Sequence, residues 1–370
     1  MAPRVLFAGG GTGGHLYPAI AIADAVRTIA PDAAIMFIGT KDKIEAQVVP
    51  KCGYAFATIW ISGVRRSLSL STLLVPVKLI TALVQSFKHI RRFRPDVVVG
   101  TGGYVCGPPA FVANLLGIPV VLQEQNSYPG VTTRLLAHRV RQVYLTFERS
   151  QRFLRRQDNT KVSGNPVRSA VGTVSREEGA QRLGIDPSRK TMIVVGGSQG
   201  AASINTAVLG AVRDLSPLGV QIIWLTGKGD AGRIRSAVDA QTGLSPIVVL
   251  PYLERMEDAY AAADLAVCRS GATTLAELMC AGLPSILVPY PFAAADHQTE
   301  NARAMVEHGA ALLCADSAAS TDLGPMMLEL FRNPQRLAAM GAAARQAAKP
   351  NAAQEIARDL FTIIAARHGG

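Results

Sequence analysis

Two glycine-rich turns constrain the fold of this 370-residue chain more than any other feature. The first turn, GGGTGGH at 9–15, follows an apolar run, and the second, GGSQGA at 196–201, follows another. After each turn, apolar residues recur with helical spacing. A strand, a small-residue turn and a helix open a doubly wound α/β domain, and such a turn aims backbone N–H groups at a ligand. Two openings of this kind predict two similar domains with a cleft between them.

Strand and helix patterns alternate along both halves of the chain, which predicts two mainly parallel sheets with right-handed crossovers. In the first half, strands are predicted at 4–8, 34–38, 57–59, 97–100, 120–123 and 142–145. In the second half, strands are predicted at 191–195, 221–225, 247–250, 265–268, 285–288 and 311–313. We expect an N-terminal domain at 1–165, a C-terminal domain at 166–345 and a final helical segment at 346–370.

Excess positive charge is confined to the first half of the chain. Residues 1–165 carry a net charge of +12 and the remainder carries −1, out of a total of +11. The first half should therefore meet an acidic partner, such as nucleic acid, an anionic membrane or a phosphorylated substrate. No stretch interleaves aromatic and basic residues as a nucleic-acid-binding surface does, so no nucleic-acid partner is expected.

The segment Ser67–Arg94 combines apolar and basic residues in a way that allows two interpretations. Its apolar residues at 73, 77, 80, 84 and 87 fall on one helical face, and arginines stand at both ends. Pro76 and Lys78 interrupt the run, so a transmembrane helix is not predicted. An apolar helix with cationic ends suits the surface of an anionic membrane. The alternative is an ordinary core helix whose basic residues are solvated.

The five cysteines are scattered, with no Cys-x-x-Cys pair and no histidine at metal-ligand spacing. We therefore expect reduced thiols and no structural metal. The N-terminal residues run directly into a predicted core strand, without the apolar segment and cleavage site of a secretory signal. Together these features predict a protein that stays on the cytosolic side of the membrane.

The first turn matches the dinucleotide-binding pattern GxGxxG through Gly9, Gly11 and Gly14, which raises the alternative of an NAD-dependent oxidoreductase. By itself the match is weak. The pattern also requires an acidic residue at the end of the second strand, where Asp42 is a poor fit. It gives the second glycine turn no role. The glycines could also serve only a tight turn between strand and helix.

His15 closes the first glycine turn, where a helix begins and the predicted cleft opens. An imidazole can take up a proton near neutral pH, so His15 is a candidate general base. The alternative is that its side chain merely caps the helix or hydrogen-bonds to the turn.

The segment Cys268–Glu277 (CRSGATTLAE) follows a predicted buried strand and opens a helix with small and hydroxyl residues. A helix N-terminus of this kind can receive a phosphate group. The carboxylate of Glu277 could accept hydrogen bonds from both hydroxyls of a ribose, or it could only interact with the helix dipole.

Seven motifs occur in a fixed order along nearly the whole chain. They are GGGTGGHLYP (9–18), GGYVCGPP (102–109), QEQN (123–126), GNPVR (164–168), GGSQGA (196–201), CRSGATTLAE (268–277) and DHQTENA (296–302). In order and spacing they resemble the MurG family of bacterial UDP-N-acetylglucosamine:lipid I N-acetylglucosaminyltransferases, part of glycosyltransferase family 28. The resemblance implies the GT-B fold, with two Rossmann-like domains and an interdomain cleft. It also implies that the donor nucleotide binds mainly to the C-terminal domain, that the lipid acceptor binds to the N-terminal domain, and that the final helix returns to the latter.

The resemblance implies roles for residues of the N-terminal domain. Thr12, Gly13 and Gly14 would face the diphosphate and sugar of the donor, and Asn126 would contact its N-acetylglucosamine (GlcNAc). We expect His15 to act as the base toward the C4 hydroxyl of the acceptor's MurNAc. Glu124 is the next candidate for this role.

The other implied substrate contacts are Arg168, Ser198, Leu253, Ala272, Thr273, Thr274, Glu277, His297 and Gln298. Arg168 and Ser198 would hold phosphate, the backbone of Leu253 would face uracil, and the helix start at 272–274 would lie under the diphosphate. Glu277 would bind the ribose. His297 and Gln298 would recognise GlcNAc hydroxyls. Some members of the family have glutamine in place of His297, so which of the two residues makes which contact stays open. Many members also have histidine where this chain has Gln123.

The resemblance implies an inverting transfer of GlcNAc from UDP-GlcNAc to lipid I, undecaprenyl-diphosphate-linked MurNAc-pentapeptide, giving lipid II for peptidoglycan synthesis. The chain has no Asp-x-Asp motif, so no metal or other cofactor is expected, and helix N-termini with Arg168 would stabilise the leaving UDP. The enzyme would be peripheral on the cytoplasmic face of the bacterial inner membrane, with partners in the machinery of cell-wall synthesis, cell shape and division. A third interpretation is a nucleotide-sugar-binding protein of the membrane surface that has no activity.

Overall fold

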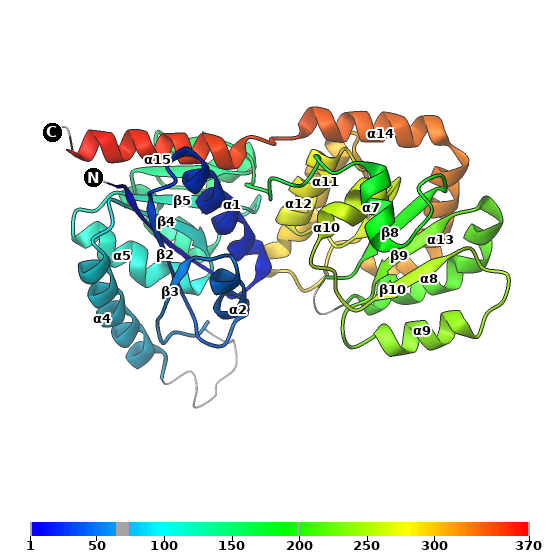
Figure 1. The fold of residues 1–370 in the computed structure, drawn as a ribbon, viewed down its shortest axis with the longest axis horizontal. Helices are drawn as coiled ribbons and strands as arrows, with labels where there is room; N and C mark the ends of the chain where they lie inside the picture. The colour runs from blue at the N-terminus through cyan, green and yellow to red at the C-terminus, as the bar shows by residue number, and fades with distance from the viewer. Residues whose placement is uncertain (1, 64–73, 198–199, 369–370) are drawn as a thin grey trace. The chain divides into compact units, whose positions relative to one another are not determined.

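The computed structural model describes residues 2–63, 74–197 and 200–368. Contacts divide the chain into two compact units: unit 1 comprises Met1–Arg168 with Pro350–Gly370, and unit 2 comprises Ser169–Lys349. Figure 1 shows both units and labels most of their helices and several of their strands.

Unit 1 is built on a seven-stranded parallel sheet with the strand order β3-β2-β1-β4-β5-β6-β7. Its strands are β1 (Arg4–Gly9), β2 (Ala34–Gly39), β3 (Ala55–Thr58), β4 (Val97–Gly102), β5 (Val120–Glu124), β6 (Gln142–Leu145) and β7 (Thr160–Val162). The central strands are apolar runs buried along almost their whole length, as helices on both faces of a parallel sheet require. The strand order reverses between β1 and β4, and ligands of such sheets bind at the carboxyl ends of the strands at this switch point.

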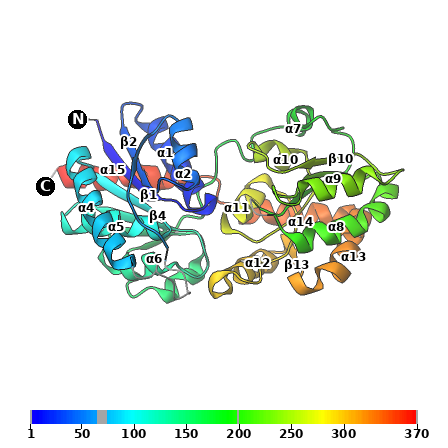
Figure 2. The same cartoon turned by 90° about the horizontal axis from the view of Figure 1, so that it is seen from below.

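Helices cover both faces of the unit 1 sheet (Figures 1 and 2). They are α1 (Gly13–Ile29), α2 (Ile44–Lys51), α4 (Val75–Phe93), α5 (Gly107–Leu115), α6 (Val131–Leu136) and α15 (Ala352–His368), with 3-10 turns η1 (Tyr104–Cys106), η2 (Ala137–Arg139) and η3 (Glu148–Phe153). Successive residues of β1 point to opposite faces. Val5 and Phe7 pack in the core that includes α1 and α15, whereas Leu6 packs in the core that includes α4 and α5.

The last helix of the chain, α15, packs within unit 1 (Figure 1). Ile356 and Leu360 are fully buried in the same apolar core as α1. The carboxylate of Asp359 accepts hydrogen bonds from Tyr144 Oη at 3.1 Å and from Lys161 Nζ at 2.7 Å. Both apolar and polar contacts therefore tie the C-terminal helix to the N-terminal sheet.

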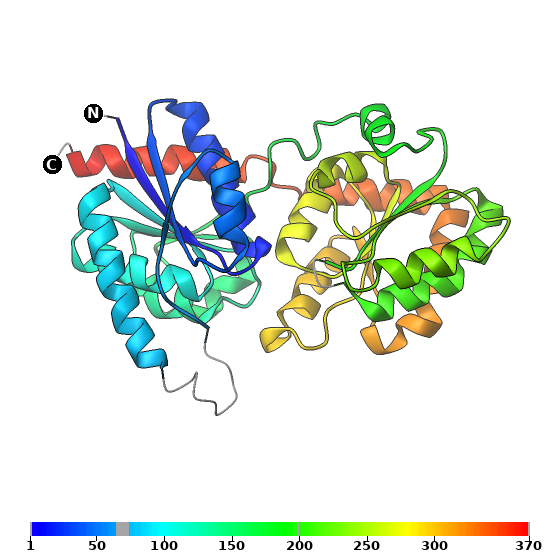
Figure 3. The same cartoon turned by 60° about the horizontal axis from the view of Figure 1, so that its bottom comes forward.

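Unit 2 is built on a six-stranded parallel sheet with the strand order β10-β9-β8-β11-β12-β13. Its strands are β8 (Thr191–Val195), β9 (Gln221–Leu225), β10 (Ile247–Leu250), β11 (Leu265–Cys268), β12 (Ser285–Leu287) and β13 (Ala311–Leu313). Its helices, seen in Figure 3, are α7 (Arg176–Leu183), α8 (Ala202–Leu215), α9 (Ala231–Asp239), α10 (Met256–Ala262), α11 (Ala272–Ala281), α12 (His297–Glu307), α13 (Ala319–Arg332) and α14 (Pro334–Ala347), with η4 (Ser216–Leu218), η5 (Ala294–Asp296) and η6 (Asp316–Ala318).

Two apolar clusters lie on the two faces of the unit 2 sheet. Trp224 on β9 is fully buried in one of them, and its indole N–H donates to Asn205 Oδ1 on α8 at 3.0 Å. The strand order reverses between β8 and β11, so the switch point of this unit lies between the second glycine turn and the start of α11. The predicted fold class, two Rossmann-like doubly wound domains with parallel sheets, is confirmed.

Helix α4 buries Ala82, Ser86 and Ile90 and leaves several other large apolar residues on the surface. Ala82 is fully buried, whereas Val77, Ile80 and Phe87 are 51%, 63% and 46% exposed. The opposite face of α4 packs on the core, whereas the predicted apolar face at 77, 80, 84 and 87 is exposed. Residues 64–73, where the predicted segment begins, lie outside the described residues.

Candidate functional site

The first glycine turn joins β1 to α1 at the switch point of unit 1. Gly11 has a φ of +82°, and a Cβ on Gly9 would fall 2.0 Å from Thr101 Oγ1 at the end of β4. Thr12 is the N-cap of α1, but its side chain does not cap the helix, and the first turn contains no acidic residue. The start of α1 at Gly13–Gly14 thus presents backbone at the positive end of the helix dipole, which suits an anionic ligand.

Glu45, which no sequence pattern singles out, holds the first glycine turn in place. Its buried carboxylate accepts hydrogen bonds from Gly11 N–H at 2.9 Å, from Thr40 N–H at 3.0 Å and from Thr40 Oγ1 at 2.7 Å. A Cβ on Gly10 would fall 2.5 Å from the Cδ of this carboxylate. Glu45, in α2, therefore supports the turn itself. Strand β2 ends in Gly39, where a dinucleotide site has an acidic residue, and Asp42 lies beyond it on an exposed position.

His15 lies in the first turn of α1 with its ring half-buried. Its Nδ1 lies 2.9 Å from Oε1 of Gln125, which follows β5. Gly102 and Gly103, at the end of β4, both have positive φ, and a Cβ on Gly102 would fall 2.8 Å from His15 Nδ1. These glycines leave the space that the ring occupies. The candidate base therefore stands at the carboxyl ends of β1, β4 and β5.

Asn126 is held in position by the neighbouring carboxylate of Glu124. The backbone N–H and the side-chain amide of Asn126 donate to Glu124 Oε1 at 3.1 and 3.4 Å. The other oxygen of Glu124 accepts from Gly130 N–H at 3.0 Å and from Thr133 Oγ1 at 2.6 Å. Both oxygens of this buried carboxylate are engaged within the protein, so the geometry disfavours Glu124 as the alternative to His15.

The start of α11 is the corresponding feature of unit 2. Its N-cap, Gly271, has no side chain to satisfy the N–H groups of Ala272–Thr274, and the first turn contains no acidic residue. Ser270, just before it, is fully buried and donates to the Gln298 carbonyl on α12 at 2.8 Å. This bond joins the starts of α11 and α12, so the implied diphosphate and sugar contacts come together at one end of the sheet.

Glu277 lies further along α11 and is 6% exposed. Its Oε2 accepts a hydrogen bond from Tyr260 Oη on α10 at 3.0 Å. Burial raises the pKa of the neighbouring Cys280 thiol to about 11, and the charge of Glu277 contributes to that rise. The carboxylate is therefore oriented by a phenol in a largely desolvated place, where a charge-assisted hydrogen bond to a ligand hydroxyl would be strong.

His297 and Gln298 begin α12 after a turn with unusual backbone. Ala295 and Asp296 both lie in the left-handed region, with φ values of +52° and +51°, which non-glycine residues seldom adopt. The side-chain oxygen of Gln298 accepts from Tyr290 N–H at 2.9 Å. Because that oxygen is engaged, the amide nitrogen of Gln298 is the group that can donate to a sugar hydroxyl.

The remaining implied contacts are Leu253, Arg168 and Ser198. The backbone N–H and C=O of Leu253, in the loop before α10, form no hydrogen bond within the part of the chain that the structure describes. Such a pair can recognise a pyrimidine edge. Arg168 falls at the end of unit 1, with its Cζ 5.5 Å from the centroid of the Tyr17 ring. Ser198 lies outside the described residues.

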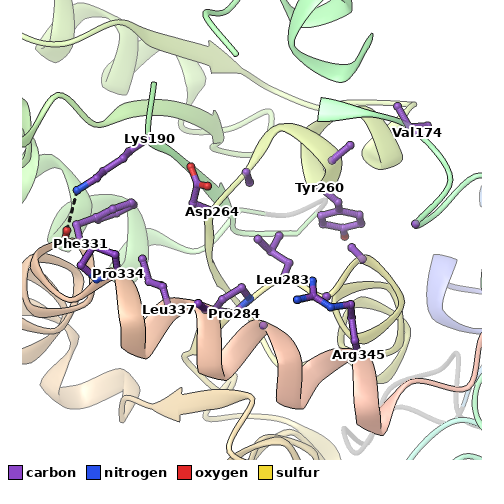
Figure 4. A pocket seen from close by; sticks show the side chains of 17 residues that line it. Val174, Lys190, Tyr260, Asp264, Leu283, Pro284, Phe331, Pro334, Leu337 and Arg345 are labelled. Atoms are coloured by element: carbon purple, nitrogen blue, oxygen red, sulfur yellow. Dashed lines mark hydrogen bonds between the residues drawn. The ribbon is translucent and has the colours of Figure 1, made fainter. Parts of the chain in front are cut away.

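A cavity of about 440 Å³ lies at the other end of the strands of the unit 2 sheet (Figure 4). Lys190, Asp264 and Pro284, which precede β8, β11 and β12, line it together with Phe331 and Leu337 from the helices α13 and α14. Lys190 Nζ donates to the Phe331 carbonyl at 3.0 Å. The cavity is thus at the amino ends of the strands, whereas the implied donor contacts follow their carboxyl ends.

None of the described helices is long and apolar enough to cross a membrane. Over the same residues, no group of three or more His, Cys, Asp or Glu side chains is arranged to hold a metal ion. The five cysteines are unpaired, and burial raises the pKa of Cys268, at the end of β11, to about 12. The thiol nearest the start of α11 therefore stays protonated at neutral pH.

Comparisons with known proteins fit this geometry. The family model described as the glycosyltransferase family 28 N-terminal domain matches residues 5–145, and the corresponding C-terminal domain model matches residues 191–356. The chain is 43% identical over 365 residues to the UDP-N-acetylglucosamine–N-acetylmuramyl-(pentapeptide) pyrophosphoryl-undecaprenol N-acetylglucosamine transferase of Chlorobium limicola, covering 97% of this chain and 99% of that protein. It is also 43% identical to the transferase of the same name from Moorella thermoacetica, covering 98% and 99%. The crystal structure of Acinetobacter baumannii MurG is similar with a TM-score of 0.76 and 28% identity, over 97% of this chain and 99% of that one.

Proposed function

The chain belongs to glycosyltransferase family 28, and from this premise we propose that it transfers GlcNAc from UDP-GlcNAc to lipid I, giving lipid II. The acceptor group is the C4 hydroxyl of MurNAc in undecaprenyl-diphosphate-MurNAc-pentapeptide. The observation that carries the proposal is the near-complete match to transferases named for this reaction, at 43% identity over 97% of the chain.

Features of unit 2 support its assignment as the main donor-binding unit. The start of α11 offers N–H groups and the positive end of a helix dipole to the diphosphate. The buried carboxylate of Glu277 would accept hydrogen bonds from the ribose hydroxyls, and the backbone of Leu253 would pair with uracil. These three contacts match the charge and hydrogen-bonding pattern of a nucleoside diphosphate.

Other residues would contact the sugar and the leaving phosphate. His297 and Gln298 lie at the start of α12, where they would hydrogen-bond to GlcNAc hydroxyls. Arg168 and Ser198 would bind phosphate and stabilise the charge that develops on UDP as it leaves. A guanidinium suits that role because it keeps its charge at any physiological pH and can bond to two oxygens at once.

The chemistry proposed for unit 1 is a single displacement assisted by a base. The C4 oxygen of MurNAc attacks C1 of the donor sugar, and His15 takes up the hydroxyl proton. The bond from C1 to the β-phosphate oxygen breaks, so UDP leaves with the electron pair and the anomeric configuration is inverted. Thr12, Gly13, Gly14 and Asn126 would contact the donor during this step.

A donor-binding comparison tests the class of enzyme. We expect UDP-GlcNAc to bind and to be displaced by UDP, because the proposed contacts recognise uracil, ribose and diphosphate. We expect no binding of NAD, because β2 ends in Gly39, where a dinucleotide site has an acidic residue for the ribose. Calorimetric titration with each ligand measures both. Binding of NAD without binding of UDP-GlcNAc would return the chain to the oxidoreductase alternative.

We also propose that α4 binds an anionic membrane surface. Its exposed face carries large apolar side chains, and Lys88, Arg91 and Arg92 follow on exposed positions near its C-terminal end. Trp60, which is 49% exposed, lies beside this helix, with Lys78 Nζ 5.5 Å from its ring centroid. Apolar residues bordered by cations are the arrangement that a peripheral membrane contact needs. The enzyme would then meet its acceptor at the membrane surface, where the undecaprenyl chain is embedded.

Neutralising two of these cations should release the protein from anionic vesicles. We expect the double change of Arg91 and Arg92 to Gln to weaken vesicle binding roughly 30-fold at low salt, since each charge near the surface contributes about 1 kcal/mol. Turnover of a soluble short-chain acceptor should be unaffected. The same changes at Arg332 and Arg345, both exposed on unit 2, are the control. Vesicle co-sedimentation that is equal for both double variants would show that α4 does not bind the membrane.

This binding would place the enzyme on the cytoplasmic face of the bacterial inner membrane. Its product would then enter peptidoglycan synthesis at that surface. Proteins of cell-wall synthesis, cell shape and cell division are the class of partner that such a location predicts.

A further inference from the structure

A chain of hydrogen-bonded amides stands behind His15. Gln125 Oε1 lies 2.9 Å from His15 Nδ1. The amide nitrogen of Gln125 faces three oxygens: the Thr101 carbonyl at 2.7 Å, the Gln123 carbonyl at 3.2 Å and the side-chain oxygen of Gln123. The amide nitrogen of Gln123 in turn donates to Asn165 Oδ1 at 3.1 Å. All four side chains are uncharged when the ring is neutral.

These surroundings fix which end of the Gln125 amide faces His15. An NH₂ group only donates hydrogen bonds, so the end that meets three acceptor oxygens must be the nitrogen. With the amide reversed, its oxygen would face those oxygens without a proton between them. Gln123 and Gln125 are only 1% and 2% exposed, so solvent could not compensate for that loss. The oxygen of Gln125 therefore faces the imidazole.

The tautomer of His15 follows from this orientation. An amide oxygen can only accept, so the hydrogen bond at Nδ1 requires that Nδ1 carry the ring proton. The lone pair of the neutral ring is then on Nε2, to which no group in the described part of the chain hydrogen-bonds.

We propose that Gln125 is a positioning residue of the active site, which holds His15 as the Nδ1–H tautomer so that Nε2 receives the proton of the acceptor hydroxyl. This inference rests on the proposed role of His15 as the base. In serine proteases, a carboxylate behind the histidine fixes the tautomer and also stabilises the imidazolium. Here an amide fixes the tautomer without adding a negative charge where two diphosphate substrates must bind. The nearby carboxylate of Glu124 is directed instead to Asn126, Gly130 and Thr133.

The tautomer can be measured in the unmodified protein. At a pH where the ring is neutral, ¹⁵N chemical shifts and ¹H–¹⁵N correlations distinguish a protonated ring nitrogen from an unprotonated one. The chain has six histidines, and loss of one set of signals in His15→Asn assigns the ring. We expect the proton on Nδ1. A proton on Nε2 of wild-type His15 overturns the proposal, whether or not any variant folds.

Gln125→Met then tests the cause of the tautomer. Methionine has a similar length but offers the ring no amide oxygen, so we expect the preference for Nδ1–H to be lost. We expect kcat to fall roughly 10-fold, less than on removal of the base itself, with the KM and Kd for UDP-GlcNAc unchanged. Gln151→Met is the control, because Gln151 is in the same unit and bonds instead to Thr160 Oγ1.

The two readouts separate this proposal from the role of His15. An unchanged tautomer in Gln125→Met overturns the positioning role of Gln125. A changed tautomer with an unchanged kcat supports the hydrogen-bond inference and overturns the assignment of His15 as the base.

Discussion

Replacing His15 with alanine should lower kcat by about 10²–10⁴-fold, the usual contribution of a general base. The variant lacks the imidazole that would take up the proton of the acceptor hydroxyl, and the nearby carboxylate of Glu124 is engaged by Asn126, Gly130 and Thr133. The affinity for UDP-GlcNAc should change little, because the proposed contacts to uracil and ribose lie on unit 2. Steady-state kinetics with a soluble short-chain lipid I analogue measures the first quantity, and calorimetry measures the second.

His15→Asn separates a base from a residue that only shapes the turn. Asparagine keeps a hydrogen-bonding side chain near Gln125 but cannot accept a proton at neutral pH. We expect its kcat to be as low as that of the alanine variant. Near-normal turnover would mean that His15 only supports the turn, and another base would have to be sought. Glu124 would be a poor replacement, since both its oxygens are already engaged.

Glu277→Ala should weaken UDP-GlcNAc binding by about 1.5–3 kcal/mol, or roughly 10- to 150-fold in Kd, because a charge-assisted hydrogen-bond pair to the ribose is lost. The carboxylate is 6% exposed and bonded to Tyr260, so the variant also loses a buried hydrogen bond. We therefore expect a modest decrease in stability beside the larger effect on the donor. Calorimetric titration at a temperature where the variant is folded measures the change in Kd.

Glu307→Ala serves as the matched control for this experiment. Glu307 ends α12 in the same unit and is exposed, so its loss should leave the Kd for UDP-GlcNAc unchanged. If Glu277→Ala binds the donor as tightly as the control does, Glu277 does not hold the ribose. Its carboxylate would then serve only the packing between α10 and α11.

The sheet core could be predicted from the sequence because its signals are local. The runs before 9 and 196 are apolar, and each ends at a turn where glycine is needed, as the φ of +82° at Gly11 and of +81° at Gly197 show. Each predicted strand has a counterpart in the structure. Strand β7 was missed because it is a three-residue edge strand with a polar sequence.

Helix α7 was not predicted from the sequence, although a capping-box motif marks its N-terminus. Ser175 accepts from Glu178 N–H and Glu178 accepts from Ser175 N–H, which is the capping box that Ser-x-x-Glu predicts. The few apolar residues of this short helix gave no clear periodicity. For α4, periodicity correctly predicted a helix but not the direction of its apolar face. Ala82, Ser86 and Ile90 face the core, whereas the periodic apolar residues face outward. Periodicity identifies an apolar face, but it cannot tell whether that face meets the sheet or the surface.

The supporting residues of the site could not be predicted, because their partners are distant in the chain. Glu45 bonds to Gly11 across 34 positions, and Gln125 bonds to His15 across 110. Neither separation along the chain has a sequence pattern of its own, since both contacts form where segments that follow different strands meet at the carboxyl ends of one sheet. The motif residues themselves were predictable because helix N-termini and glycine turns have recognisable compositions.

Transfer of labelled GlcNAc to lipid I is the most direct test of the proposed function. The wild-type protein is incubated with UDP-[¹⁴C]GlcNAc and lipid I in mixed micelles, and the extracted lipid and the released UDP are quantified. The proposed function predicts a β-1,4-linked GlcNAc–MurNAc lipid and one UDP released for each sugar transferred. Binding of UDP-GlcNAc with no labelled lipid would contradict it, and the chain would then be a nucleotide-sugar-binding protein without transferase activity.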